Sequence, residues 1–259
     1  MSKSRRLRSM MQVDFRRLFT TSRLPIFLLI ALMMPVLILT MTTMVGGTEV
    51  TNPQTGAVTT MEAFTNTWQV IGTESGTDMM AMDMTTMVNI NLIFFMAGVF
   101  VCLFVADDFR SGYAKNLFTV RSHKMDYVIS KTVSGCIAGA LMLLAFFIGA
   151  VIGGGAAGLP FTLGAAGVIG LVMCMMAKIL LMPVFVPIAV AVSVFGKSRS
   201  WLSILLFAFA GMLLFMMIPM LTPLDAGIMN VGLCLAGGVM FGIGLCKVSE
   251  MLLRRQDLV

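Results

Sequence analysis

The amino-acid sequence predicts an all-α integral membrane protein with six transmembrane helices, and two observations carry this prediction. The first is composition: the 259 residues are 58% hydrophobic and 12% charged, with a mean hydropathy of +0.97, whereas about a quarter of the residues in soluble domains are charged. The second is the distribution of basic residues, which alternates between successive polar segments as it does when Lys- and Arg-rich loops stay cytoplasmic.

Before the first apolar run, residues 4–20 form a basic amphipathic segment. Apolar residues recur there at helical spacing, and arginines occupy much of the opposite face. We expect this segment to lie in the inner membrane interface, with its arginines at anionic headgroups. The apolar face comprises Leu7, Met10, Met11, Phe15, Leu18 and Phe19.

Six apolar runs follow, each long enough to cross a hydrocarbon core of about 30 Å. They cover residues 24–44, 88–106, 127–152, 161–195, 201–220 and 227–247 of a single transmembrane domain, 1–259. Because the first run lacks a small-residue cleavage site, we expect an uncleaved span rather than a signal peptide. Of the 18 Lys and Arg residues, all but Lys178 fall on the predicted inside, and the exterior loop 45–87 holds none. Both termini are therefore predicted to be cytoplasmic, in a plasma membrane of bacterial type.

The fourth run, 161–195, is too long for one straight span, and Pro183 and Pro187 are expected to kink it. Lys178, within this run, would cost about 2.5–3.5 kcal/mol at mid-membrane, so it should face the protein interior or a wet cavity. Two interpretations stay open: a residue of the substrate path or subunit interface, or a structural lysine bound to carbonyls that the prolines free.

Three glycine pairs at GxxxG spacing allow close approach of helices, either within the chain or between subunits. They are Gly135 with Gly139, Gly149 with Gly153, and Gly238 with Gly242.

Catalytic and cofactor motifs are missing from the sequence. His123 is the one histidine, no HExxH or GxSxG occurs, and no carboxylate pair falls within a span. The Gly196-Lys197-Ser198 triplet resembles the end of a P-loop, but residue 191 is Ala rather than the required Gly. We therefore expect no enzyme activity, no nucleotide site and no cofactor in this chain. The net charge of +6 reflects the inside bias and does not indicate nucleic-acid binding.

Sulfur residues offer one metal hypothesis. The cysteines, all within apolar runs, are expected to be buried free thiols; they are Cys102, Cys136, Cys174, Cys234 and Cys246. A methionine cluster in the exterior loop could bind Cu(I), although the chain has 27 methionines overall and the cluster fits a general bias. The cluster comprises Met79, Met80, Met82, Met84 and Met87.

The cytoplasmic stretch 107–126 is the most informative segment for function. Its acidic start favours a helix N-terminus, and its apolar residues give it more apolar surface than a solvated loop needs. A charged, partly apolar helix of this kind is typical of docking onto a soluble partner or the membrane surface. The residues predicted to dock are Asp107, Asp108, Phe109, Arg110, Gly112, Lys115, Leu117 and Phe118.

This stretch resembles the segment between spans two and three in permease subunits of type-2 ABC exporters, of the drug or antimicrobial-peptide export or immunity type. The family pattern of an acidic residue, Arg-x-Gly-Thr, a basic residue and an apolar turn is met with Asp in place of Glu and Tyr in place of Thr. The matching residues are Asp108, Arg110, Gly112, Lys115 and Leu117, followed by Lys124 and Lys131. Chain size, an N-terminal interfacial helix, six spans and cytoplasmic termini agree with the same family.

The resemblance implies that the stretch 107–126 forms a coupling helix, which with the interfacial helix contacts a separate ATPase subunit. Two such ATPases, which would hold ATP and Mg, and a second permease, identical or related, would complete an exporter. Met, Phe and Leu along the path suit an amphipathic or hydrophobic cargo such as a peptide, drug or lipid-like molecule. Alternative hypotheses are a self-sufficient channel or secondary transporter, and a permease for copper-enzyme maturation.

Overall fold

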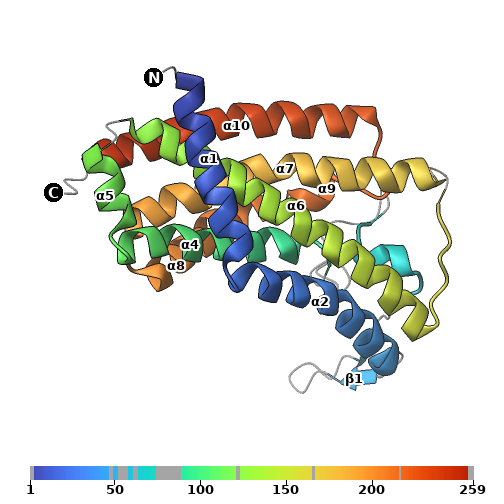
Figure 1. The fold of residues 1–259 in the computed structure, drawn as a ribbon. Helices are drawn as coiled ribbons and strands as arrows, with labels where there is room; N and C mark the ends of the chain where they lie inside the picture. Colours follow the sequence, from blue (N-terminus) through green and yellow to red (C-terminus); the bar gives the residue numbers. More distant parts are fainter. Residues whose placement is uncertain are drawn as a thin grey trace.

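The computed structural model describes residues 3–46, 49–51, 58–60, 64–73, 89–120, 123–164, 167–215 and 217–255 (Figure 1). The exterior methionine cluster lies outside these residues. The helices are α1 (Lys3–Thr20), α2 (Arg23–Val45), α4 (Leu92–Arg110), α5 (Tyr113–Val120), α6 (Lys124–Ala157), α7 (Gly167–Gly196), α8 (Ser200–Phe215), α9 (Ile218–Leu221) and α10 (Ile228–Arg255), with the 3-10 helix η1 (Thr67–Val70). Two short antiparallel strands, β1 (Glu49–Thr51) and β2 (Val58–Thr60), pair Glu49 with Thr60.

Within the described residues, five helices are long and apolar enough to cross a membrane: α2, α4, α6, α7 and α10. They overlap five of the six predicted runs. Helices α2 and α6 contain theirs whole, with α2 extending the run 24–44 by one residue at each end, whereas α4 begins at Leu92 rather than at 88 and α7 at Gly167 rather than at 161. Helices α7 and α4 are the most buried, whereas α2 and α10 have few fully buried residues and several exposed large apolar ones. The exposed apolar surface of α2 and α10 suits contact with lipid.

The sixth predicted run, 201–220, is divided between α8 and α9. The 16 residues of α8 rise about 24 Å, less than the hydrocarbon core of about 30 Å. Pro219 lies in the first turn of α9, where its missing N–H and fixed φ suit the start of a new helix. By contrast, α7 continues as one helix through Pro183 and Pro187.

The glycine pairs pack helices of this one chain together. A Cβ added to Gly153 would lie 2.8 Å from Val36 Cα, where α6 crosses α2, and one added to Gly149 would contact the Leu32 carbonyl. A Cβ at Gly238 would lie 2.6 Å from the Leu180 carbonyl oxygen, where α10 meets α7. These close approaches are the arrangement that small residues permit between helices in lipid.

Replacing Gly153 by Leu should therefore separate α2 from α6. Overpacking of a well-packed site costs about 1–3 kcal/mol, so the G153L protein should unfold at a clearly lower temperature in detergent. The matched control is Gly155→Leu, two residues further along the same helix, where an added Cβ meets no atom within 4 Å. Equal thermal unfolding of the two variants would contradict the packing role.

Candidate coupling site at the charged end

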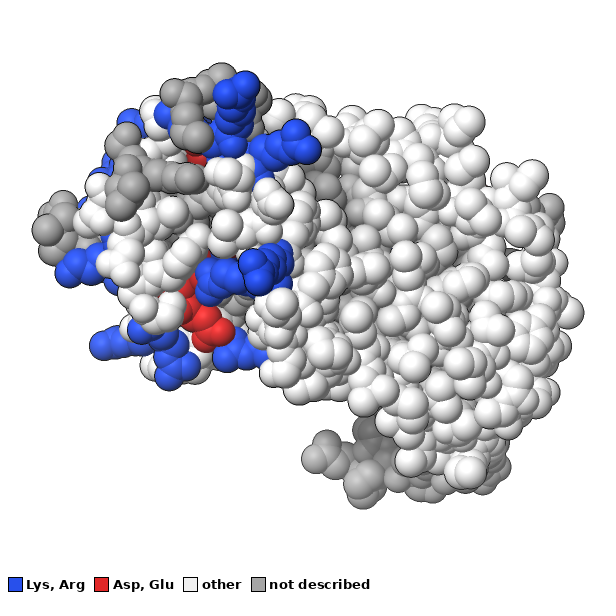
Figure 2. All heavy atoms as spheres, viewed as in Figure 1, with Lys and Arg blue, Asp and Glu red and all other residues white. Residues whose placement is uncertain are grey.

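Charged side chains gather at one end of the molecule. Figure 2 shows Lys and Arg concentrated where both termini, α1 and α5 lie, while the rest of this face is almost uncharged. The long apolar helices run away from this end, so the Lys and Arg residues seen on this face lie at one pole, while the exposed Asp225, between α9 and α10, lies away from it. These are the segments that the positive-inside pattern predicts to be cytoplasmic.

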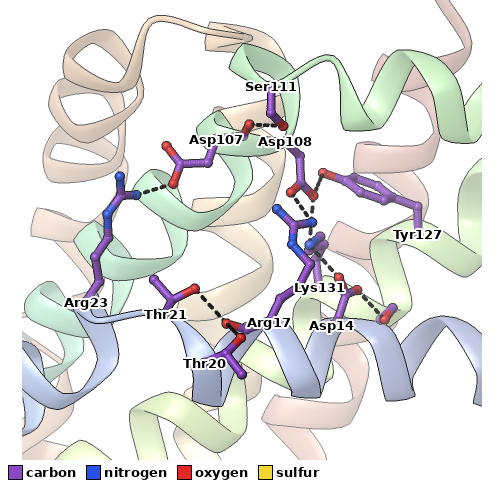
Figure 3. A network of polar contacts seen from close by, with 11 residues as sticks. Asp14, Arg17, Thr20, Thr21, Arg23, Asp107, Asp108, Ser111, Tyr127 and Lys131 are labelled. Carbon is purple, nitrogen blue, oxygen red and sulfur yellow. Dashed lines mark hydrogen bonds and ion pairs between the residues drawn. The ribbon is translucent and has the colours of Figure 1, made fainter.

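A buried ion network holds this end together (Figure 3). Lys131 Nζ, in the second turn of α6, lies 2.7 Å from Asp14 Oδ1 of α1 and 2.7 Å from Asp108 Oδ2 at the end of α4. All three side chains are fully buried. Arg17 of α1 completes the network, with Nη1 2.7 Å from Asp108 Oδ1. These ion pairs thus connect three helices, α1, α4 and α6, that are far apart in the sequence.

The network is balanced in charge and well supplied with hydrogen bonds. Two carboxylates face two cations, so their charges cancel. The Tyr127 hydroxyl donates to Asp108 Oδ2 at 3.0 Å, and the Ser130 hydroxyl donates to Asp14 Oδ2 at 2.5 Å. Burying ions costs several kcal/mol each unless geometry and extra hydrogen bonds compensate, and losing one partner of such a pair costs about 3–5 kcal/mol.

Arg17 extends the network toward α5. Its guanidinium lies 4.5 Å from the ring centroid of Tyr113, the first residue of α5. Burial acts to lower the pKa of Arg17, but the neighbouring Asp108 carboxylate more than offsets this, and the pKa is raised overall. Arg17 therefore stays a cation.

Two outer ion pairs surround the buried network. Arg23, at the start of α2, pairs with Asp107, and Arg6 Nε lies 3.9 Å from Asp126 Oδ2 in the first turn of α6. Gly112, between α4 and α5, has φ +71°, a conformation that glycine adopts without a Cβ penalty. Helix α5 consequently sits between two segments, the end of α4 and the start of α6, that are both clamped to α1.

The residues predicted to dock divide into two groups. Arg110 and Lys115 are exposed. The others are at least partly buried, and Phe118 packs edge-on against Tyr127 with ring centroids 5.3 Å apart. Asp108 is fully buried in the network. The inward group is Asp107, Asp108, Phe109, Gly112, Leu117 and Phe118.

The partners of Asp108, above all Lys131 and through it Asp14, were not predicted from the sequence. The expectation that the apolar face of α1 lies at the acyl boundary also needs correction, because Met10 and Leu18 are buried against the protein. Asp14 stands between them at i±4 spacing and is the one acidic residue before Glu49. A carboxylate on an apolar helix face needs a buried partner. The isolated Asp14 on the apolar face of α1 was therefore the sequence signal that could have indicated a buried ion pair.

Lys178 lies apart from the network, near the opposite end of the bundle. It is fully buried, and its Nζ donates to Asn91 Oδ1 at 3.0 Å and to Thr222 Oγ1 at 2.8 Å. Its acceptors are thus side-chain oxygens, not the proline-freed carbonyls that one interpretation expected. Asn91 precedes α4 and Thr222 follows α9, so Lys178 ties α7 to both. Among the described residues, no group of three His, Cys, Asp or Glu side chains could hold a metal ion.

A bundle of apolar helices with a charged pole defines a multi-pass membrane protein. Residues 21–214 match the family model described as ABC-2 family transporter protein, and the chain belongs to that family. It is thereby a permease of an ABC transporter, a transport subunit of a kind that is generally not itself catalytic, and the family implies an ABC ATPase partner. Neither the curated proteins nor the solved structures include a significant match to this chain.

Proposed function

We propose that this permease exports an amphipathic or hydrophobic cargo, such as a peptide, drug or lipid-like molecule, when ATP hydrolysis in a separate subunit moves α5. Six crossings are formed by α2, α4, α6, α7, the α8–α9 pair and α10, with both termini in the cytoplasm of a bacterial-type cell. Helix α1 lies along the inner interface. Two ATPases, holding ATP and Mg, and a second permease complete the assembly.

The observation that carries this proposal is the buried network of Asp14, Arg17, Asp108 and Lys131. Because it joins α1, the end of α4 and the start of α6, a force on α5 reaches three helices at once. Packed cores respond to such displacements by switching between discrete arrangements. Arg110 and Lys115 are exposed, so they can contact the ATPase. The buried Asp108 passes the resulting movement to α1 and α6 through its ion pairs.

A hydrophobic cargo is supported by an apolar cavity of about 260 Å³ between α4, α7 and α8. Its lining is almost wholly apolar and includes Phe95, Phe185, Phe207 and Met212. Ligand pockets of about 300–1,000 Å³ are typical for whole drug-sized molecules, so this cavity suits part of a hydrophobic ligand.

Gly211 allows the cavity to be filled with little steric strain. A Cβ there would lie 3.7 Å from Phe207, an ordinary contact, so Gly211→Leu should fold and should weaken export of a hydrophobic fluorescent cargo several-fold. The control is Gly237→Leu on α10, where an added Cβ meets no atom within 4 Å. Unchanged export by G211L would argue against cargo binding in this cavity.

The proposal as a whole is tested by purification of the chain from its native membrane in mild detergent. We expect a P-loop ATPase to copurify in stoichiometric amount and to be lost from the R110E/K115E variant. The control K197E/R199E reverses two exposed cations in the loop between α7 and α8 and should retain it. Transport by the purified chain alone, without ATP, would favour a self-sufficient channel or secondary transporter instead.

A further inference from the structure

We infer that the cytoplasmic end of α10 is a further element of the ATPase-docking surface, beside α5 and α1, and that this surface recognises an acidic face of the ATPase subunit. The inference rests on the proposed function, since it requires an ATPase partner. The residues of α10 lie outside the region that matches the family model, which ends at residue 214.

The length of α10 places its end beyond the membrane. Its 28 residues rise about 42 Å, so a helix near the membrane normal that starts at the outer hydrocarbon boundary extends about 12 Å past a core of about 30 Å. Lys247 then marks the inner boundary, and Arg254 and Arg255 lie past a headgroup layer of roughly 5–7 Å. At that distance from the hydrocarbon core, a soluble protein is closer to these arginines than the lipid headgroups are.

The Lys124 side chain links this end of α10 to α5. Lys124 Nζ donates to the Leu253 carbonyl oxygen at 2.7 Å, and Leu253 is fully buried. The same ammonium lies 5.9 Å from the ring centroid of Phe118 in α5. Because lysine near a helix C-terminus satisfies the last carbonyls, α10 is fixed in place beside the coupling helix rather than fraying into solvent.

The charge at this end is not neutralised within the described chain. Every described cytoplasmic carboxylate already has a cation partner: Asp14, Asp107, Asp108, Asp126 and Glu250 are all in ion pairs. Glu250 pairs with Arg254, whose side chain is nevertheless 71% exposed. Exposed cations remain on α1, α5 and α10 and at the end of α4, at Arg5, Arg8, Arg16, Arg110, Lys115, Arg254 and Arg255. A protein that docks here must therefore present carboxylates, because like charges would repel it.

The test is a titration of the ATPase against the full-length permease in nanodiscs that contain only zwitterionic lipid. We expect Arg254→Glu with Arg255→Glu to weaken ATPase binding roughly tenfold or more, and wild-type affinity to fall as salt rises. Lys124→Met should weaken binding by a smaller factor, because it frees the end of α10. The control K197E/R199E makes the same change of charge on the same side of the membrane and should bind as wild type.

The outcomes separate this inference from the function on which it rests. If the ATPase binds wild type and R254E/R255E with equal affinity, the α10 surface is not a docking element, although the permease assignment stands. The titration is repeated in nanodiscs that contain anionic lipid: if R254E/R255E weakens binding there but not in zwitterionic nanodiscs, the cations serve the membrane surface and the inference is wrong. If the ATPase binds neither protein, the proposed function fails along with it.

Discussion

Replacing Lys131 by Met should destabilise the protein by about 3–5 kcal/mol, because the two buried carboxylates would be left with one cation, Arg17, which pairs with Asp108. Asp14 would lose its cation outright, keeping only the bond from Ser130. The measurement is the free energy of unfolding in detergent and denaturant. The exposed cation Lys115, replaced by Met, is the control and should change stability by no more than about 0.5 kcal/mol.

A double-mutant cycle tests whether the charges act as one unit. Asp14→Asn combined with Lys131→Met restores neutrality, leaving Asp108 with Arg17. The double variant should thus be less destabilised than the sum of the single variants, with a coupling of about 0.5–3 kcal/mol. Simple additivity would show that the side chains contribute independently and that no network exists.

Replacing Lys178 by Met should loosen the connection after α9. Hydrogen bonds to charged groups contribute about 1.5–3 kcal/mol each, and Lys178 makes two, to Asn91 and Thr222. Removing the buried cation also relieves about 2.5–3.5 kcal/mol of insertion cost. The global free energy of unfolding should therefore change little, while local stability falls in the segment around Thr222, which Lys178 binds.

Amide hydrogen exchange localises this effect. The Thr222 amide bonds to the Ile218 carbonyl and the Leu224 amide to the Thr73 carbonyl, so both should exchange at least tenfold faster in K178M, a change of about 1.4 kcal/mol. Thr222→Val removes one of the same bonds and should show a weaker form of this change. Unaltered exchange together with altered cargo affinity would instead make Lys178 a residue of the substrate path.

The positions of the long helices were largely predictable because an apolar run long enough to cross a bilayer favours a helix. The run 24–44 and helix α2 differ by one residue at each end. The run 201–220 shows where this reasoning stops, since hydropathy does not register the break that precedes Pro219. Length and apolarity therefore predict where a span can lie more reliably than whether its helix is continuous.

The candidate site was only half visible in the sequence. Asp108 and Arg110 stand in a motif, but a motif does not reveal that one side chain is buried and the other exposed. Asp14 and Lys131 are 117 positions apart, and pairing at that separation depends on how α1 packs against α6. The GxxxG pairs likewise indicated close packing without showing whether the neighbour belongs to this chain or to another.

The central claim is that the buried network transmits motion from the ATPase to the spans. Asp14→Asn tests it most directly, because Asp14 is fully buried and cannot touch the partner. The measurement is cargo exported per ATP hydrolysed by the folded, ATPase-bound variant in proteoliposomes. We expect ATP hydrolysis to persist in D14N while export per ATP falls sharply below that of the wild type. A native ratio in D14N, with the ATPase bound, would contradict the account.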